Sequence, residues 1–299
     1  MRLIVTGTNG QVALALIERG AAQNVDVAAI GRSWRPGLDL ADPATVASVL
    51  SAVDGDVIIN AAAYTAVDKA ESEEELATRI NGEGAGAVAR AAARRGVPFL
   101  HLSTDYVFDG SLDRPWREDD PTCPIAAYGR SKLAGEQAVL RENPGATILR
   151  TAWVYAPFGA NFVRTMLRLG ETREEVSVVA DQHGAPTAAL DIADALIAIA
   201  RKRLAEPANP ALSGVFHMSG GGEATWADFA EEIFAEAERH GRKPVRVRRI
   251  GTADYPTPAR RPANSRLDNS KLKNVYGVAL PDWRLSTRAC VARLLQDSN

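Results

Sequence analysis

The sequence predicts an α/β protein built on a doubly wound parallel sheet, followed by a smaller C-terminal lobe. Short β-branched runs alternate with longer helical patterns in the first half, and a glycine-containing turn follows the first run. After about residue 155 the alternation weakens, and proline and glycine interrupt the pattern. A repeated strand–helix–strand order is typical of a parallel sheet covered on both faces, which binds ligands at the carboxyl ends of its strands.

Five strands are expected in the first half, at residues 3–5, 25–30, 56–60, 98–103 and 147–150. Helical patterns separate them at residues 11–19, 43–53, 71–95 and 127–141, and Asp42 is a suitable N-cap for the second helix. Further helices are expected at residues 162–169, 191–205 and 226–240. We therefore expect residues 1–155 to form the sheet domain. Residues 156–299 should form mainly the second lobe, with some segments returning to the first domain.

The composition argues against several classes of protein. The chain has 299 residues, of which 46% are hydrophobic and 24% are charged, as in a soluble globular protein. Its 35 basic and 37 acidic side chains nearly cancel, so charge indicates neither nucleic acid nor a membrane surface as a partner. Cys123 and Cys290 form no disulfide framework, and no apolar run suits a secretory signal or a membrane span. These observations predict a cytoplasmic protein.

The first expected strand runs into a turn that is typical of Rossmann-type dinucleotide-binding domains. A tight turn at Gly7 and an open backbone at Gly10 would let a pyrophosphate approach the N-terminus of the next helix, where N–H groups and the dipole favour an anion. Ala13 stands where a third glycine often allows close packing. An ordinary glycine-rich turn is the alternative. The cofactor-binding candidates in this segment are Gly7, Asn9, Gly10, Gln11 and Val12.

The residues after the second expected strand indicate which dinucleotide binds. NAD enzymes commonly have an acidic residue there, but this chain has Arg32 and Ser33. A guanidinium beside a hydroxyl suits a 2′-phosphate, so NADPH is the expected cofactor and NADH is left open as a second one. A solvated surface arginine is the alternative interpretation. Asp39 and Leu40 are candidates for the adenine edge of the site.

Small residues follow the third expected strand, after Asn60. They would let the cofactor lie against the backbone, although plain helix–sheet packing would also favour alanine. The cofactor-binding candidates here are Ala62, Ala63, Tyr64 and Thr65.

Tyr128 and Lys132 stand four residues apart in an expected helix, so they share one face. An ammonium stabilises a nearby phenolate, so we expect Lys132 to lower the pKa of Tyr128 and also to hold the nicotinamide ribose. Such a tyrosine can protonate the alkoxide that forms when a hydride reaches a carbonyl. A hydroxyl at the end of the fourth strand can polarise the same oxygen. Thr104 is the first candidate and Ser103 the alternative, because alternate side chains of a strand face opposite ways.

These motifs resemble those of the extended short-chain dehydrogenases. The shared segments are residues 6–10, 60–65 and 103–108 and the Tyr128–Lys132 pair. Further segments make the chain resemble, more narrowly and over nearly its whole length, the dTDP-4-dehydrorhamnose reductase family; these are residues 65–71, 150–155, 181–187 and 261–267.

The resemblance implies NADPH-dependent reduction of the 4-keto group of dTDP-4-dehydro-L-rhamnose, the last step of dTDP-rhamnose synthesis. It implies that Tyr128 is the proton donor, that Thr104 aligns the carbonyl and that Lys132 positions the ribose. The product would be used in a cell-surface polysaccharide.

The resemblance also implies contacts to the substrate and bears on metal binding. Asp105 and Trp153 would contact the sugar, and Arg261 or its neighbour Arg260 would bind the diphosphate, because a guanidinium matches phosphate oxygens in bidentate fashion. Some members are metal-bridged dimers through an acidic residue early in the first helix. Residues 13–16 here contain no carboxylate, so no Mg²⁺ site is predicted, and the chain is expected to be a monomer or a homodimer.

Two alternatives stay open beside this reductase. The first is another nucleotide-sugar reductase, dehydratase or epimerase of the same superfamily; a dehydratase usually has an acidic pair beside the threonine, whereas Tyr106 follows Asp105 here. The second is a non-catalytic NADP-binding module, similar to a regulatory subunit of methionine adenosyltransferase. The presence of Thr104, Tyr128 and Lys132 together favours catalysis.

Overall fold

A six-stranded parallel sheet forms the centre of the computed structural model, which describes residues 1–34 and 37–296. Its strands lie in the order β10-β5-β4-β3-β1-β2, and each paired register is parallel. The predicted doubly wound parallel sheet is therefore confirmed. The strand bounds are β1 (Arg2–Thr6), β2 (Asp26–Ile30), β3 (Val57–Asn60), β4 (Phe99–Thr104), β5 (Thr147–Thr151) and β10 (Gly214–His217).

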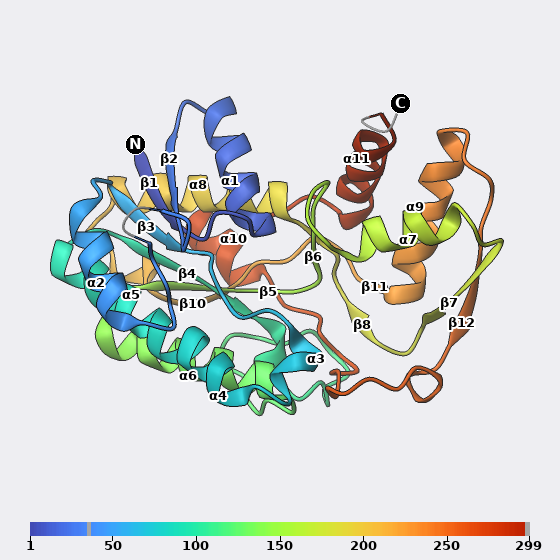
Figure 1. Ribbon diagram of the computed structural model, residues 1–299, viewed down its shortest axis with the longest axis horizontal. Coiled ribbons are helices and arrows are strands. Elements are labelled where there is room, and N and C mark those ends of the chain that lie inside the picture. Colours follow the sequence, from blue (N-terminus) through green and yellow to red (C-terminus); the bar gives the residue numbers. More distant parts are fainter. Residues whose placement is uncertain (35–36, 297–299) are drawn as a thin grey trace.

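Helices cover both faces of this sheet (Figure 1). Alternate strand residues feed two apolar cores: Leu3 and Val5 pack with one set of helices, and Ile4 packs with the other. The first set is α1 (Gln11–Ala22), α8 (Ala189–Ala205) and α10 (Ser270–Tyr276). The second set is α2 (Pro43–Ala52), α5 (Ala85–Arg95) and α6 (Ala127–Glu142).

The second half of the chain contributes to two places. It supplies β10, α8 and α10 to the sheet, and it builds a separate lobe around Phe229, Ile233 and Trp283, drawn on the right of Figure 1. Short strands and three helices form this lobe: β6 (Val154–Tyr155), α7 (Phe162–Gly170), β7 (Glu175–Val179), β8 (His183–Gly184), β9 (Thr187–Ala188), β11 (Ala224–Thr225), α9 (Trp226–Arg239), β12 (Arg246–Ile250) and α11 (Trp283–Gln296). Single 3-10 turns lie at η2 (Asp105–Val107), η3 (Pro210–Leu212) and η4 (Thr252–Asp254).

The long helix expected at residues 71–95 is wrong in detail. A turn separates α3 (Val67–Ala70) from α4 (Glu74–Thr78), and α4 continues through a π-helical segment, η1 (Arg79–Gly84), into α5. The other expected helices and all five expected strands are present, with ends shifted by a few residues. Asp42 caps α2 as predicted, accepting from the Ala44 N–H at 3.1 Å.

The π-helical segment places Asn81 against α6. Its amide accepts from the Tyr64 N–H at 2.8 Å and donates to the Tyr64 carbonyl at 3.0 Å and to Ser131 Oγ at 2.9 Å. Gly135 permits this approach, because a Cβ there would lie 2.2 Å from the Asn81 carbonyl oxygen. Such π-segments often mark functional sites, and this one ties the loop after β3 to α6.

Within the described ranges, none of the helices combines the length and apolar character that crossing a membrane requires.

Candidate active site

The turn between β1 and α1 has the geometry of an anion site. Gly7 has a φ of 93°, a left-handed conformation that favours glycine, and its N–H donates to the Ile30 carbonyl at 2.6 Å. Gly10 is the N-cap of α1, and among the described residues nothing lies within 4 Å of the position of a Cβ there. Because Gly10 has no side chain with which to cap the helix, the first N–H groups of α1 are available to a phosphate.

The other candidates in this turn differ in exposure. Asn9 is exposed, Gln11 is half-buried and Val12 is buried in the core. The Gln11 side chain donates to the Val154 carbonyl at 3.4 Å and accepts from Asn161 Nδ2 at 3.0 Å. The dinucleotide turn is therefore linked directly to the second lobe, through an asparagine that sequence reasoning did not identify.

Arg32 and Ser33 lie exposed in the turn after β2, close to the end of β1. Asp39 is engaged locally, since its carboxylate accepts from the Ala41 N–H at 2.9 Å. Leu40 is buried against η1, where a Cβ on Gly84 would lie 2.4 Å from the Leu40 carbonyl oxygen.

The segment after β3 lies beside the dinucleotide turn. The Ala62 N–H donates to Thr6 Oγ1 at 3.1 Å, and the Ala62 methyl is 3.4 Å from the position of a Cβ on Gly7. The Tyr64 hydroxyl donates to Glu73 Oε2 at 2.8 Å. Ala63 is half-buried and Thr65 is exposed at the end of this segment. The structure thus brings two separately predicted groups of residues together at one edge of the sheet.

Thr104 and Tyr128 also meet at this edge. Thr104 Oγ1 donates to Asp105 Oδ1 at 2.9 Å and accepts from the Tyr106 N–H at 3.2 Å. Burial and then the charge of Asp105 raise the pKa of Tyr128 above its ordinary value, while a hydrogen bond with Thr104 opposes the rise. The phenol is therefore kept neutral, which is the form that a proton donor needs.

Lys132 lies on the same face of α6 but points at the backbone of β4. It is buried, and its Nζ donates to the Leu102 carbonyl at 2.7 Å. Burial lowers the pKa of Lys132 to about 8, and Glu136 opposes this effect. The expected lowering of the Tyr128 pKa by Lys132 is wrong for this structure, because burial of the phenol outweighs any such effect and the ammonium is directed at a carbonyl oxygen.

The two candidate hydroxyls of β4 have different neighbours, although both contact side chains of α6. Ser103 Oγ donates to Glu136 Oε1 at 2.6 Å, whereas Thr104 faces Asp105 and Tyr128. The geometry therefore favours Thr104 over Ser103 as the hydroxyl beside the tyrosine.

Asp105 is a buried carboxylate directly beside Thr104. Burial raises the pKa of Asp105 to about 6, although hydrogen bonds from Ser265 and Thr104 oppose the rise. Within the described part of the chain its Oδ2 atom has no partner at normal hydrogen-bond distance. An under-satisfied buried acceptor is suited to bind a ligand hydroxyl.

Trp153 has an unusual backbone and a rigid setting. Its φ is 49°, and its ring stacks on Trp226 with centroids 3.7 Å apart. Gly184 lies close to this ring, since a Cβ there would be 2.4 Å from it. Strained non-glycine residues of this kind cluster at functional sites.

Arg261 does not point freely into a ligand site. Its Nη2 and Nη1 atoms donate to Asp68 Oδ2 and Oδ1 at 3.0 and 3.2 Å. Asp68 also accepts from the Ala259 N–H at 3.2 Å. Sequence reasoning did not identify Asp68, because its partners lie more than 190 residues away.

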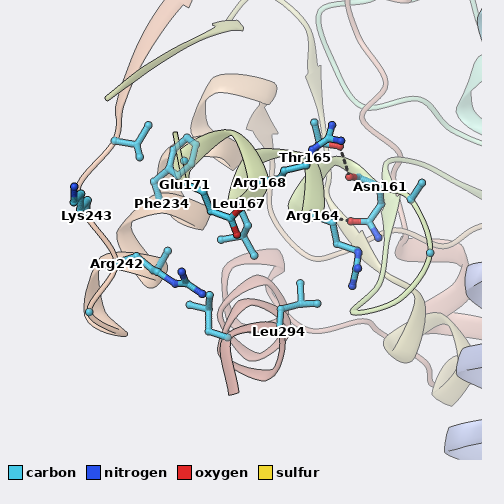
Figure 2. A pocket seen from close by; sticks show the side chains of 17 residues that line it. Asn161, Arg164, Thr165, Leu167, Arg168, Glu171, Phe234, Arg242, Lys243 and Leu294 are labelled. Carbon is cyan, nitrogen blue, oxygen red and sulfur yellow. Dashed lines mark hydrogen bonds between the residues drawn. The ribbon is translucent and has the colours of Figure 1, made fainter. Parts of the chain in front are cut away.

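A separate cavity of about 830 Å³ lies in the second lobe, between α7, α9 and α11 (Figure 2). Its polar lining includes Arg164, Arg168, Arg242 and Lys243. The described residues that line it include none of the sequence-predicted site residues, so this cavity is distinct from the candidate active site.

The residues gathered at this end of the sheet define a nicotinamide-dependent oxidoreductase of the short-chain dehydrogenase class. Comparison with known proteins narrows the class. The chain belongs to the dTDP-4-dehydrorhamnose reductase family, because the family model described as the RmlD substrate binding domain matches residues 1–296 and full-length relatives of that name exceed 30% identity. Among the residues the structure describes, no group of three or more His, Cys, Asp or Glu side chains is placed to hold a metal ion.

Three similar proteins illustrate this relationship. A dTDP-4-dehydrorhamnose reductase from Sinorhizobium fredii is 52% identical over 295 residues, which cover 99% of this chain and 98% of the relative. The crystal structure of a Bacillus anthracis dTDP-4-dehydrorhamnose reductase in complex with NADP has a TM-score of 0.88 at 35% identity, and the match covers 98% of this chain and 99% of that one. A probable dTDP-4,6-dihydroxy-2-methyloxan-3-one 4-ketoreductase from Streptomyces antibioticus is 40% identical over 99% of this chain and 96% of the relative.

Proposed function

We propose that this protein reduces the 4-keto group of dTDP-4-dehydro-L-rhamnose with NADPH and forms dTDP-L-rhamnose, the last step of dTDP-rhamnose synthesis. One observation carries the proposal: a half-buried, neutral Tyr128 stands beside Thr104 at the end of the sheet where the dinucleotide turn lies. The choice of substrate rests on the full-length similarity to reductases of this name. The protein works in the cytoplasm as a monomer or homodimer, and its product serves a cell-surface polysaccharide.

The cofactor is held by residues 1–155, the NADP(H)-binding domain. The turn at Gly7 and Gly10 binds the pyrophosphate, and Arg32 with Ser33 binds the 2′-phosphate. Lys132 positions the nicotinamide ribose. When bound, the cofactor supplies a hydride to the carbonyl carbon. The remaining contacts come from Asn9, Gln11, Val12, Asp39, Leu40, Ala62, Ala63, Tyr64 and Thr65.

The proton comes from the chain itself. Thr104 turns its hydroxyl from Asp105 to the 4-keto oxygen and fixes the carbonyl beside Tyr128. Tyr128 then gives its phenolic proton to this oxygen as negative charge develops there. The phenolate that remains takes a proton from solvent and restores the starting state. The raised pKa of Tyr128 keeps the proton in place until the oxygen becomes basic.

The substrate lies between the two halves of the chain, and residues 156–299 form mainly its binding lobe. Asp105 accepts a hydrogen bond from a sugar hydroxyl through its Oδ2 atom, which has no hydrogen-bond partner among the residues that the structure describes. Trp153 packs against the sugar ring. Arg261 releases Asp68 and binds the diphosphate, because a diphosphate with two negative charges is a stronger partner than one exposed carboxylate.

A second candidate is the reduction of a different dTDP-linked keto sugar. The name of the Streptomyces relative favours it, since that protein shares 40% identity with this chain. The same acid and cofactor site would serve either reaction, so the choice depends on the sugar contacts. A non-catalytic NADP-binding role is the remaining alternative.

The test mixes purified protein with dTDP-4-dehydro-L-rhamnose and follows the loss of nicotinamide absorbance, with NADPH and NADH in parallel. Oxidation that the Tyr128→Phe variant abolishes supports the reaction and the acid together. If folded protein binds NADPH but oxidises none, the rhamnose assignment fails. Other dTDP-keto sugars then separate the second candidate from the non-catalytic one, because only a reductase turns any of them over.

A further inference from the structure

Three consecutive residues of β4 contact three successive turns of α6. Tyr128, Lys132 and Glu136 are spaced by four residues, so they lie along one face of that helix. The contacts run from the Leu102 carbonyl to Lys132 Nζ at 2.7 Å, from Ser103 Oγ to Glu136 Oε1 at 2.6 Å, and from the Thr104 side chain to Tyr128. Glu136 thus follows the proposed acid, Tyr128, and the proposed ribose ligand, Lys132, along the same face of the helix.

Glu136 is the most fully bound of these groups. Its side chain is 4% exposed and receives Arg150 Nε on Oε1 at 2.9 Å and Arg150 Nη2 on Oε2 at 2.7 Å. Arg150 lies on β5 directly opposite Ser103 in the sheet register. Two neighbouring strands therefore hold one carboxylate beneath the site, in a fixed orientation.

This ion pair is a poor device for stability alone. Replacing a buried ion pair with apolar side chains of similar volume is often neutral or stabilising, so its presence calls for a further reason. The neighbouring ammonium supplies one. Lys132 is buried with a carbonyl oxygen as its hydrogen-bond partner, and a buried cation is unfavourable unless an anion lies near it.

The other ionisable groups around Lys132 do not supply that anion. His101 on β4 is neutral, because Asn60 Nδ2 donates to its Nδ1 and burial holds its pKa well below the usual range. Tyr128 on α6 is neutral, and Arg150 on β5 is a cation. The Asp105 carboxylate follows β4, but Glu136 is the carboxylate whose charge raises the pKa of Lys132 against the effect of burial. Asn81 of η1 carries no charge. Glu136 is one helical turn away on the same face.

We propose that Glu136, held by Ser103 and Arg150, is a positioning residue that keeps Lys132 protonated and its ammonium fixed at the floor of the cofactor site. The inference rests on the role proposed above for Lys132 in holding the nicotinamide ribose. Glu136 acts through Lys132 and does not touch the reacting atoms.

The test measures the NADPH dissociation constant between pH 6 and 9.5, from the fluorescence of the bound dihydronicotinamide. Glu136→Gln removes the charge at constant shape. The double variant Glu136→Leu with Arg150→Met replaces the whole pair with apolar groups and keeps the test available if the single variant does not fold. Glu142→Gln is the control, since Glu142 lies on the same helix and pairs with Arg90 at the surface.

We expect the loss of NADPH affinity at alkaline pH to begin about one pH unit lower in Glu136→Gln, because a nearby opposite charge shifts a pKa by about that amount. In the double variant the shift has the same direction but is smaller, because removing the Arg150 cation partly offsets the loss of the carboxylate. At pH 8 the affinity of Glu136→Gln falls about fivefold relative to wild type, while at pH 6 it is unchanged. Glu142→Gln follows the wild-type profile. A folded Glu136 variant whose affinity is wild-type throughout, or is reduced equally at every pH, overturns the proposal. No sugar is needed, so this result is independent of the rhamnose assignment.

Discussion

Arg261 and Asp68 form a two-point ion pair across 193 residues of sequence, with nitrogen–oxygen distances of 3.0 and 3.2 Å. The pair joins the loop after β12, which carries Arg261, to α3, the short helix that carries Asp68. Arg261 also holds the pKa of Asp68 below its ordinary value. In the proposed mechanism this guanidinium exchanges the carboxylate for the substrate diphosphate.

Arg261→Gln should therefore raise the KM for the nucleotide sugar about tenfold and leave kcat nearly unchanged, because a charge-assisted hydrogen bond contributes about 1.5–3 kcal/mol. Asp68→Asn should change KM less, since it removes only the competing partner. Steady-state kinetics at saturating NADPH measure both effects. Arg260→Gln is the matched control, because Arg260 is the exposed neighbour. If Arg260→Gln has the larger effect, the diphosphate contact belongs to that residue instead.

Tyr128→Phe should lower kcat by about two to four orders of magnitude, the usual contribution of a positioned general acid. NADPH binding should be unaffected, since the ring remains. Tyr106→Phe is the matched control, because its ring packs edge-on against Tyr128 with centroids 5.5 Å apart and it has no proposed role. Single-turnover NADPH oxidation distinguishes them. Equal losses in both variants would show that ring packing, and not the phenol, matters.

Arg32→Ala should weaken NADPH binding about ten- to hundredfold and leave NADH binding unchanged, since only NADPH has the 2′-phosphate that the guanidinium binds. The measurement is the ratio of the two dissociation constants. Arg94→Ala, an exposed arginine at the end of α5, should leave that ratio as it is in wild type. If Arg32→Ala leaves the ratio of the two dissociation constants unchanged, Arg32 is a solvated surface residue and does not bind the 2′-phosphate.

The raised pKa of Asp105 predicts that the free energy of unfolding depends on pH. Its pKa in the folded protein, about 6, lies above the ordinary value of 3.8. Stability associated with its protonated form is present below pH 4 and is lost as the pH rises through 6. Asp105→Asn should thus be more stable than wild type by about 1–3 kcal/mol at pH 8 and no more stable at pH 4, while losing activity. Denaturant unfolding at the two pH values checks this, and an equal difference at both would contradict it.

Gly184→Ala should move the ring of Trp153. A Cβ at this position would lie 2.4 Å from the indole, which is also held by Trp226. We expect a loss of about 1–3 kcal/mol in unfolding free energy and a higher KM for the sugar. Thermal unfolding and kinetics measure these effects. Gly145→Ala is the control, because a Cβ there meets only Asn143 Oδ1 at 3.4 Å. An unaltered KM in Gly184→Ala would separate Trp153 from the sugar.

Much of the sheet could be predicted from local pattern, because the first five strands are short, largely apolar runs that alternate with longer helical patterns. The interruption of the helix at residues 71–95 could not, since the π-turn at Asn81 depends on contacts with Tyr64 and α6. The strand β10 was also missed, because four residues in a glycine-rich region carry little periodicity.

The candidate site shows the same division. The Tyr128–Lys132 spacing and the hydroxyl of Thr104 are visible in the sequence, and the structure brings Thr104 to Tyr128. Their roles stay predictions. The direction of the Tyr128 pKa was predicted wrongly, because burial depends on the whole fold and not on one neighbour. Asp68, Asn161 and Glu136 were missed because each acts through a partner that is distant in sequence or on another strand.

The strand β10 has a consequence for how the chain is made. It pairs with β5, yet more than 60 residues separate the two strands. During synthesis, therefore, the outer edge of β5 stays bare after the first five strands have left the ribosome, and an uncovered edge is a template for joining other chains. A chain that terminates between the two strands is therefore expected to associate with other chains rather than to form a small functional domain. A chain that stops before His217 therefore has β5, an internal strand of the complete sheet, as an exposed edge strand.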